Sequence, residues 1–475
     1  MASNRSWKTY EATYRAKEMK VLANWIMAGL SGAVVGLPGC GRSNLLGFLC
    51  NRVEVMKAYL PVRDHPFVVV PVDLNDLLIN DLSTFYRIFL RAFYRYLNHL
   101  DPEFQTMVTE LYQQYQAEPD FFVVQSAIYD LLKAFQERQV QVVLVLNRFE
   151  DFYEAATVQM LNALRGLRDN FRDTLSFFIG MPQAVAYLAN PTGLGNMYEL
   201  LDNQVCWVGP MSDADAQAVI TQETFAAQRP LPERERAQML QLTGRFPALL
   251  KAVCGWWLTQ PERPPLEAWT SLLLVERSVQ HRLSKIWNFL TQEEQYALTE
   301  IQKMQGQLLG KPTRQTEAGF KKLTNQYSRV MEGLVIKGVC EPQGNQWRIL
   351  GDLLDGYIRQ SGQPSRGRIW QDDQNSLFQG NSRLNDLTEL QDRVLTYFLA
   401  HPHKKLTHTD IIYNSWPDRK LKKGVAPESL YTLIKELRSK IEPGQGTYHY
   451  IVNWRGEPEG GYQFFPEGRP DTGGA

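Results

Sequence analysis

The stretch Val34-Val-Gly-Leu-Pro-Gly-Cys-Gly-Arg-Ser43 constrains the fold more than any other part of the chain. It places Gly36, Gly39 and Gly41 between a short apolar run and the apolar start of a helix. Glycines at such a turn let the backbone curl, so that its N–H groups and the N-terminus of the following helix face a bound phosphate. The spacing therefore predicts a phosphate-binding loop between a β-strand and an α-helix.

Both charged positions expected of a nucleotide-hydrolysing site are altered. Arg42 stands where such a loop carries lysine, and its planar, forked guanidinium cannot take the compact place of an ammonium beneath the terminal phosphates. Asn147 follows the apolar run of residues 142–146, where an aspartate usually holds magnesium. Because asparagine carries no charge, magnesium affinity should fall. We expect nucleotide binding to survive better than hydrolysis.

The remaining candidates for the nucleotide site follow from the same two motifs. Ser43 would supply a hydroxyl to Mg²⁺. Asn147 and Glu150 are the candidate catalytic residues, and either Glu150 or Asp151 could polarise a water. The alternative is that Glu150 and Asp151 only cap the next helix. The phosphates of ATP or ADP are expected to contact the loop residues Gly36, Pro38, Gly39, Cys40, Gly41, Arg42, Ser43 and Asn44.

Short apolar runs alternate with long amphipathic stretches in the first part of the chain. The runs lie at 32–35, 67–72, 140–146, 175–179 and 205–208. Strands that alternate with helices indicate a parallel sheet covered on both faces. We therefore predict an α/β P-loop NTPase core over 1–210. Because the strand signals then disappear, we predict a helical lid over 211–280.

The rest of the chain divides into two further units. Residues 281–360 combine helices with a hairpin that turns near Gly344 and Asn345, which predicts a winged helix. Residues 361–383 are rich in Gly, Ser, Pro and other polar residues, which predicts a linker. The last unit spans 384–466, and a tail over 467–475 is expected to be disordered.

The unit over 384–466 has three amphipathic helical segments followed by two strands around a glycine-rich turn. Its third helix, over 427–441, has an apolar stripe, and the opposite face is expected to carry aromatic, hydroxyl and basic groups. Such a face suits entry into the major groove of double-stranded DNA. The residues expected on it are Tyr431, Thr432, Lys435 and Arg438.

Basic residues near that helix add candidate contacts to DNA phosphates. Arg455 lies in the predicted wing, while Lys422 and Lys423 lie in a basic loop that either touches phosphates or is only solvated. Residues 391–466 contain eleven Lys or Arg and eight Asp or Glu, so their net charge is near +3. Because the whole chain balances 51 basic against 51 acidic residues, a DNA-binding surface has to be local.

Several motifs carry a resemblance to AAA+ and STAND signalling ATPases, close to the origin-recognition type. They are YRAKE at 14–18, GLPGCGRS at 36–43, VVLVLNRFED at 142–151, LNALRGLRD at 161–169 and VGPMSDADA at 208–216. The resemblance covers residues 10–360. It implies that the lid motif GRFP at 244–247 approaches the nucleotide, with Arg245 as a candidate for a phosphate contact or an interdomain contact. It also suggests Arg165 and Arg168 as charges that face a neighbouring subunit, the alternative being a solvated helical face.

A second resemblance covers about 80 residues at the end of the chain. The segment LRSKIEPG at 437–444, followed by a strand, Arg455-Gly456 and GYQF at 461–464, is similar to the OmpR/PhoB-type winged-helix domain of response regulators. This resemblance implies a DNA-binding domain. The wing departs from the family's pattern because it carries the acidic residues Glu457 and Glu459.

These features support one leading hypothesis and two alternatives. The leading hypothesis is a cytoplasmic nucleotide-binding switch or scaffold, with weak or no hydrolysis, that directs a winged helix to DNA as a regulator of transcription, defence or mobile elements. The first alternative is an active ATPase whose turnover resets a homo-oligomer. The second is a scaffold whose winged helices bind a protein partner. The five cysteines form no CxxC pair and the apolar runs are strand-sized, so neither a disulfide framework nor a membrane segment is expected.

Overall fold

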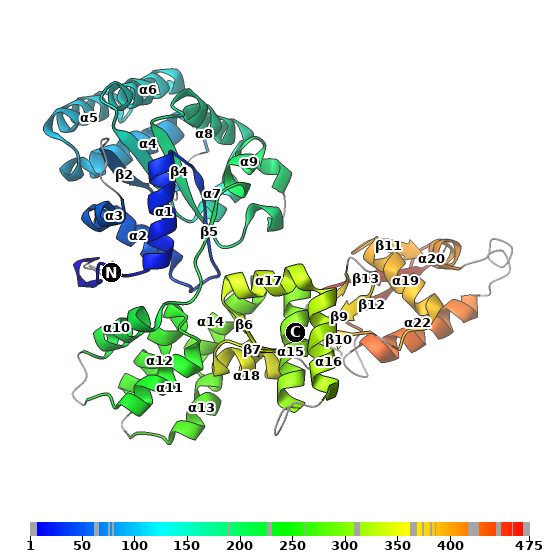
Figure 1. Cartoon of the computed structure of the whole chain (residues 1–475). Helices are drawn as coiled ribbons and strands as arrows, with labels where there is room; N and C mark the ends of the chain where they lie inside the picture. Colours follow the sequence, from blue (N-terminus) through cyan, green and yellow to red (C-terminus); the bar gives the residue numbers. More distant parts are fainter. Residues whose placement is uncertain are drawn as a thin grey trace. The chain divides into compact units, whose positions relative to one another are not determined.

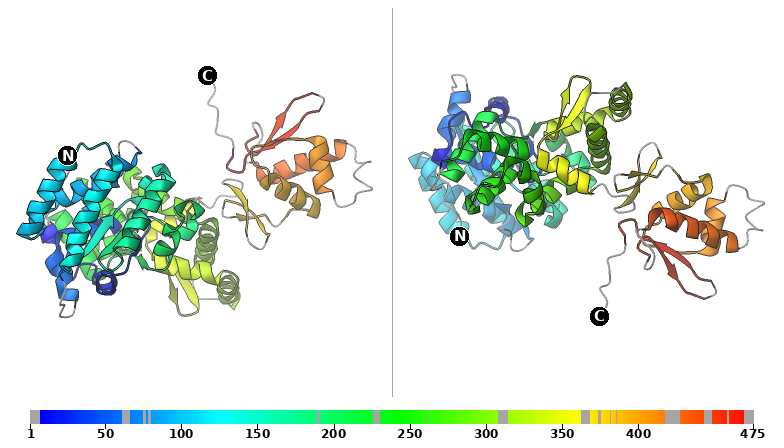
Figure 2. Two further views of the ribbon diagram at one scale, coloured as in Figure 1. Left: turned by 90° about the horizontal axis from the view of Figure 1, so that it is seen from above. Right: turned by 90° about the horizontal axis from the view of Figure 1, so that it is seen from below.

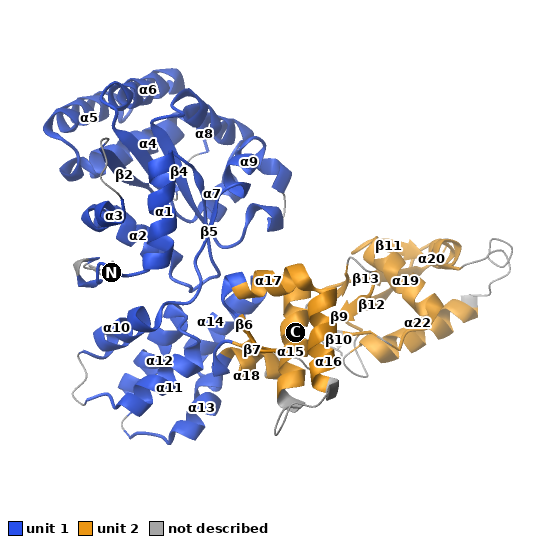
Figure 3. Ribbon diagram, viewed as in Figure 1, with its two compact units in different colours: residues 1–289, 336–339, 350–353 blue, residues 290–335, 340–349, 354–475 orange. Residues whose placement is uncertain are grey.

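The chain folds into two compact units, shown in different colours in Figure 3. Unit 1 comprises residues 1–289, 336–339 and 350–353, and unit 2 comprises residues 290–335, 340–349 and 354–475. The computed structural model describes residues 7–60, 66–74, 77, 80–188, 191–225, 230–260, 262–307, 314–361, 368–372, 375–380, 382–384, 386–416, 427–442, 448–457 and 459–468.

A five-stranded parallel sheet forms the centre of unit 1. Its order is β2-β3-β4-β1-β5, so β1, which precedes the glycine loop, lies inside the sheet. The strands are β1 Gly32–Val35, β2 Phe67–Val72, β3 Gln141–Leu146, β4 Leu175–Met181 and β5 Val205–Trp207. Each of the five predicted apolar runs is therefore a strand, and the predicted α/β P-loop NTPase architecture is confirmed for this part of the chain.

Helices cover both faces of this sheet (Figures 1 and 2), which explains why the strands are almost continuously apolar. One face packs on α1 Ala16–Ala28 and α2 Arg42–Asn51, and α3 Val53–Tyr59 packs on these two helices. The opposite face packs on α4 Leu82–Arg95, α6 Phe121–Glu137, α8 Val158–Asn170 and α9 Met197–Asp202. Two further helices of the core are α5 Pro102–Tyr115, which packs on α4 and α6, and α7 Phe149–Ala155, which follows β3.

Helices alone make up the described part of unit 1 between β5 and residue 289. They are α10 Asp213–Thr224, α11 Glu233–Thr243, α12 Pro247–Thr259, α13 Trp269–Val275 and α14 Arg277–Asn288. Gly244 ends α11 in the left-handed region, with φ of 55°. The helical character predicted for 211–280 is therefore present, and it continues to the end of α14.

Unit 2 begins with helices followed by a two-stranded antiparallel hairpin. The elements are α15 Gln292–Gln307, α16 Arg314–Gln326, α17 Ser328–Lys337, β6 Cys340–Gln343, β7 Gln346–Ile349 and α18 Asp352–Ser361. Gln343 pairs with Gln346, so the chain turns at Gly344 and Asn345, as predicted. Gly344 has a φ of 61°, which accounts for the glycine at the turn.

Residues 361–383 were predicted to form a linker, and for the described part of this segment the prediction is wrong. The structure has a three-stranded antiparallel sheet here, made of β8 Ile369–Gln371, β9 Leu377–Gln379 and β10 Ser382–Arg383. Strands of two or three residues are too short to show an alternating pattern. Ile369 and Leu377 belong to the same buried apolar cluster as the helices that follow, so this sheet is part of the C-terminal domain.

The C-terminal domain places two strands after its last helix. It contains α19 Glu389–Leu399, β11 Lys405–Thr407, α20 His408–Ser415, α22 Pro427–Ile441, β12 Ile451–Trp454 and β13 Gly461–Phe464, with sheet order β11-β13-β12. The predicted apolar stripe of α22 is buried at Leu430, Leu433, Ile434, Leu437 and Ile441. Of the predicted tail, residues 469–475 lie outside the described part of the chain.

Candidate functional site

The loop between β1 and α2 requires glycine for two separate reasons. Gly39 and Gly41 have φ of +87° and +95°, a region that L side chains rarely adopt. A Cβ on Gly36 would lie 2.6 Å from the carbonyl oxygen of Val208, so no larger residue fits there. Gly41 is the N-cap of α2, and no side chain caps that helix. The N-terminus of α2 is therefore open to an anion, which the helix dipole would stabilise.

Arg42, at the lysine position of the loop, forms an ion pair with Glu150. Its Nη2 lies 3.1 Å from Glu150 Oε1, and the two side chains are 11% and 26% exposed. Glu150 lies in the first turn of α7, directly after the loop that follows β3. The cation of the loop and the candidate catalytic carboxylate are thus paired with each other.

This ion pair leaves two buried polar atoms without a partner in the described part of the chain. Arg42 Nε and Glu150 Oε2 are both buried and make no hydrogen bond. An unsatisfied buried polar group costs about 1–3 kcal/mol. The pairing of Arg42 with Glu150 is therefore incomplete, and a ligand with additional hydrogen-bonding atoms could improve it.

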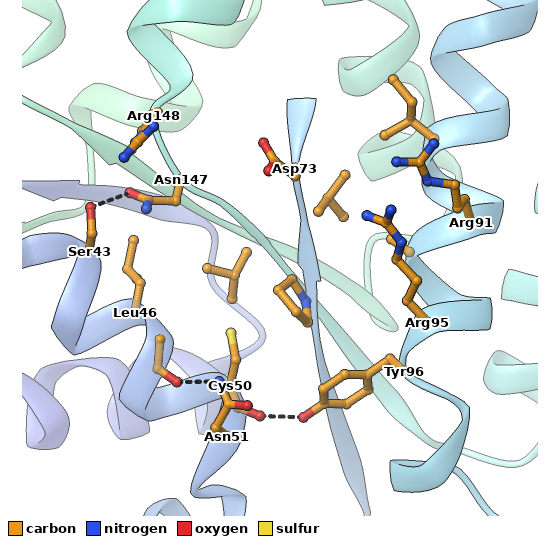
Figure 4. Close-up of a pocket in the computed structure, with 16 residues that line it drawn as sticks. Ser43, Leu46, Cys50, Asn51, Asp73, Arg91, Arg95, Tyr96, Asn147 and Arg148 are labelled. Atoms are coloured by element: carbon orange, nitrogen blue, oxygen red, sulfur yellow. Dashed lines mark hydrogen bonds between the residues drawn. The ribbon is translucent and has the colours of Figure 1, made fainter. Parts of the chain in front are cut away.

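Ser43 and Asn147 meet at the expected magnesium position (Figure 4). Ser43 Oγ donates to Asn147 Oδ1 over 3.4 Å. Both oxygens are neutral, whereas Mg²⁺ in proteins is usually held by one or two carboxylates together with substrate phosphates. The donor set therefore fits Mg²⁺ only where nucleotide phosphates contribute the negative charge.

Arg15, which belongs to the sequence motif YRAKE, holds the glycine loop by a hydrogen bond. Its side chain is 1% exposed, and its Nη2 donates to the carbonyl oxygen of Cys40. Its Nη1 donates to the carbonyl oxygens of Gly209 and Pro210 over 2.8 and 3.1 Å. The backbone N–H of Arg15 donates to Asp215 in α10 over 3.2 Å. Arg15 thus joins the glycine loop to residues 209–210, which connect β5 with α10.

The motif GRFP at 244–247 reaches the glycine loop, but Arg245 does not. The backbone N–H of Ala248 donates to the carbonyl oxygen of Gly39 over 3.1 Å. A Cβ on Gly41 would lie 3.1 Å from Pro247, which shows how closely α12 packs on the loop. Arg245 instead donates to Asp213 over 2.9 Å, so the prediction that its side chain approaches the nucleotide is not what the structure shows.

A cavity of about 470 Å³ lies over the glycine loop within unit 1. Of the predicted nucleotide contacts, all but Cys40 and Arg245 line it. The thiol of Cys40 is buried, and this burial raises its pKa. Among the described lining residues, Glu150 is the one carboxylate, whereas the basic residues are Arg42, Lys251, Arg282 and Lys285. The cavity is therefore suited to a ligand with several negative charges.

The basic residues Lys251, Arg282 and Lys285 were missed at the sequence level. Lys251 lies on α12, four residues after the proline of the GRFP motif, and donates to Glu223 over 2.5 Å. Arg282 and Lys285 lie on α14 at a spacing of three, which places them on the same helical face. The spacing was visible in the sequence, but the approach of α14 to a loop about 240 residues earlier was not.

The two arginines of α8 have structural partners. Arg168 is 9% exposed, and it donates to Ser31 over 3.1 Å and to the carbonyl oxygen of Gly29 over 2.8 Å. Arg165 pairs with Asp169 over 2.9 Å on the same helix. Arg168 was expected either on a solvated helical face or facing a neighbouring subunit. Neither interpretation fits, because its guanidinium is buried and hydrogen-bonded within the core.

The predicted DNA-contacting residues of α22 occupy two different environments. Tyr431, Thr432 and Lys435 are exposed on the helix, as is Arg455 in the loop after β12. Arg438 was expected on the same face but is only 9% exposed. Lys422 and Lys423 lie outside the described residues. The exposed basic surface described for this domain is therefore smaller than predicted.

The guanidinium of Arg438 is used to join α22 to β12. It donates through Nε and Nη2 to the carbonyl oxygen of Ile451, and through Nη2 to Asn453 Oδ1 over 2.8 Å. The ring of Tyr448 covers it at 3.6 Å from the ring centroid. Burial lowers the pKa of Arg438 below its usual value. Its expected projection away from the apolar stripe is wrong, since a residue at the edge of the stripe can fold back onto the wing.

A cavity of about 860 Å³ lies beside α22 and the wing formed by β12 and β13. Its basic lining residues are Lys435, Arg438 and Arg455, and its aromatic ones are Tyr431, Tyr448, Trp454 and Tyr462. Glu459 lies nearby and accepts hydrogen bonds from the backbone N–H and the hydroxyl of Thr409. Aromatic and basic groups therefore meet in one concave surface of this domain.

The described residues contain neither a metal-binding cluster nor a membrane-spanning helix. No group of three or more His, Cys, Asp and Glu side chains there could hold a metal ion. No described helix is long and apolar enough to cross a membrane.

Comparisons with known proteins found distant structural likenesses only. No protein-family model and no curated protein matches the chain. Similar solved structures include a Walker-type ATPase of Pyrococcus abyssi, with 13% identity, a TM-score of 0.41, and coverage of 73% of this chain and 95% of that one. Two others are Cdc6p from Pyrobaculum aerophilum and the Aeropyrum pernix ORC1 protein in complex with DNA, each with 14% identity and a TM-score of 0.32 over 73% of this chain, and covering 93% and 92% of those chains. At these TM-scores the likenesses carry no argument, and the fold assignment rests on the sheet order and the glycine loop.

Proposed function

We propose that this protein is a nucleotide-binding regulator of the AAA+ or STAND type that binds ATP or ADP, hydrolyses it weakly or not at all, and directs a winged-helix domain to double-stranded DNA. The Arg42–Glu150 ion pair carries this proposal. A carboxylate that has to activate a water needs to be free to accept its proton. Glu150 is instead held by a guanidinium at 3.1 Å, and Asn147 offers Mg²⁺ no charge.

Nucleotide binding is supported by the charge of the cavity over the loop. Arg282 and Lys285 add positive charge near the open N-terminus of α2, whereas Lys251 is paired with Glu223 and Glu150 is paired with Arg42. Anionic phosphates are favoured by such an arrangement even where the metal site is weak. Nucleotide would then contact both the loop and the helices α12 and α14, and so would stabilise one arrangement of these elements.

DNA binding is supported by the exposed residues on α22 and the wing. Tyr431, Thr432 and Lys435 project from one helix, and Arg455 follows β12. A helix with such a face, followed by two antiparallel strands, is the arrangement of a winged-helix domain. Residues 281–360 also place helices before an antiparallel hairpin, which supports the proposal of a second winged helix there.

The DNA assignment is tested with Lys435→Ala combined with Arg455→Ala in the full chain. We expect each lost phosphate contact to reduce the slope of log affinity against log salt by about 1, and the affinity at 0.1 M salt to fall by about tenfold or more. Fluorescence anisotropy with a mixed-sequence duplex, with and without ATP, measures both quantities.

The matched control is Lys404→Ala, which removes an exposed lysine of the same domain that does not line the cavity beside α22. Its affinity and salt slope should stay at the wild-type values. Equal DNA binding by the double variant and by wild type would contradict the assignment of α22 as a DNA-reading helix.

A protein partner is the second candidate for the same surface. Three tyrosines around α20 and α22 are well exposed, namely Tyr413 at 57%, Tyr431 at 46% and Tyr448 at 43%. Tyrosine is enriched at protein interfaces. Absence of any salt-dependent DNA binding in the experiment above would favour this candidate.

A further inference from the structure

A second cavity, of about 500 Å³, lies between α2 and α4, and its lining residues are drawn in Figure 4. Ser43 lines both cavities. The second one is lined by α2, by the ends of β2 and β3, and by α4. Its apolar lining includes Leu46, Ile88 and Val145. The volume is in the range of pockets that bind small molecules.

Three arginines and one carboxylate line this second cavity. Arg91 and Arg95 reach it from α4, and Arg148 reaches it from the residue before α7, while Asp73 follows the end of β2 (Figure 4). Arg91 is half-buried, and Arg95 and Arg148 are exposed. Among the described lining residues the charge is therefore three positive against one negative. Planar guanidinium groups bind phosphate through paired hydrogen bonds.

The backbone at Arg148 provides an independent observation. Arg148 has φ of 58° and ψ of 45°, in the left-handed region. Residues other than glycine are uncommon in this region, and those found there cluster at ligand sites. Asn147, next to it, also lines the cavity and has no charge. An aspartate at this position would oppose an anion, so Asn147 and Arg148 together favour one.

We propose that the cavity between α2 and α4 binds the phosphate group of a small phosphorylated molecule. Arg91 and Arg95 would hold the phosphate from α4, and Arg148 would approach the ligand from the side of Asn147 (Figure 4), while Leu46, Ile88 and Val145 would pack on the rest of the ligand. Asparagine instead of aspartate at position 147 would then favour phosphate binding in this cavity, although it lowers the affinity of the nucleotide site for Mg²⁺. The proposal does not depend on nucleotide at the glycine loop.

The test is calorimetric titration of the full chain with inorganic pyrophosphate. Wild type should bind two equivalents, one at the glycine loop and one between α2 and α4. Arg91→Gln combined with Arg95→Gln should retain one equivalent. Arg148→Gln, at an exposed residue, should weaken one of the two sites by about tenfold, and it decides the question if the double variant does not fold.

Two further variants separate this proposal from the proposed function. Arg87→Gln, on α4 but outside the cavity, should bind both equivalents as wild type does. Arg42→Ala should weaken only the site at the glycine loop. Two outcomes would overturn the second site. In the first, wild type binds a single equivalent, which Arg42→Ala weakens and the α4 and Arg148 variants leave unchanged. In the second, the α4 and Arg148 variants bind two equivalents with the affinity of wild type. Wild type could also bind a single equivalent that the α4 and Arg148 variants weaken and Arg42→Ala leaves unchanged. This outcome would support the second site and contradict phosphate binding by the glycine loop.

Discussion

Arg42 in unit 1 was expected to contact nucleotide phosphates and Arg438 in unit 2 was expected to face DNA, and in the structure both are bound within the protein. Their partners differ. Arg42 pairs with a carboxylate that is 26% exposed, and its Nε has no hydrogen bond. Arg438 donates to the backbone carbonyl oxygen of Ile451 and lies under the ring of Tyr448. A side-chain partner at a cavity can be exchanged for a ligand, whereas a backbone partner inside the fold cannot.

Because the partner of Arg42 can be exchanged, we expect that substitutions can restore nucleotide hydrolysis at this site. In Arg42→Lys combined with Asn147→Asp, the ammonium frees space at Glu150 and the new carboxylate can hold Mg²⁺. We expect steady-state phosphate release to rise on the order of 100-fold, since metal-ion catalysis contributes several kcal/mol. Phosphate release is measured with and without EDTA.

The single variants are the controls for this experiment, because each corrects only one of the two altered positions. Both should release phosphate more slowly than the double variant. High turnover by wild type itself, abolished by Glu150→Gln, would contradict the comparison and support the alternative of an active ATPase.

At the Arg438 site the comparison predicts a loss of stability. Arg438→Gln leaves the Ile451 carbonyl oxygen without its donors and removes the cation from the Tyr448 ring. We expect the free energy of unfolding of the C-terminal domain to fall by about 2 kcal/mol. Urea unfolding followed by tryptophan fluorescence measures the change, and Lys435→Ala, at an exposed position on the same helix, should shift it by less than about 0.5 kcal/mol. A variant as stable as wild type would show that Arg438 is available to ligands after all.

The smallest effect is expected from neutralising the partner of Arg42. Glu150→Gln breaks the ion pair while keeping the shape of the side chain, so Arg42 becomes available to phosphate. Because the pair is partly exposed, we expect nucleotide affinity to rise only about two- to fivefold. Calorimetric titration with ADP measures this, with Asp151→Asn as the control at the neighbouring exposed carboxylate. Weaker binding by Glu150→Gln would mean that Glu150 contributes to the nucleotide site rather than competing for Arg42.

Local patterns were sufficient to predict most of the elements. Each apolar run became a strand, because a parallel strand buried on both faces has to be apolar along its length. The hairpin turn at Gly344 and Asn345 followed from turn chemistry alone. The strands over 369–383 were missed because each is two or three residues long and is held by long-range pairing, such as Ile369 N–H with the carbonyl oxygen of Pro466.

By itself, the sequence determined the glycine loop, the altered residues Arg42 and Asn147, and the helix-and-strand order that follows. Only the tertiary structure decided which partner each charged side chain has. Arg42 and Glu150 are 108 positions apart, and Arg282 approaches a loop about 240 positions earlier. Glycine conformations and apolar periodicity act over a few residues, so a sequence displays them. The partner of a charged side chain depends on which distant elements pack beside it, and that is settled only when the chain has folded.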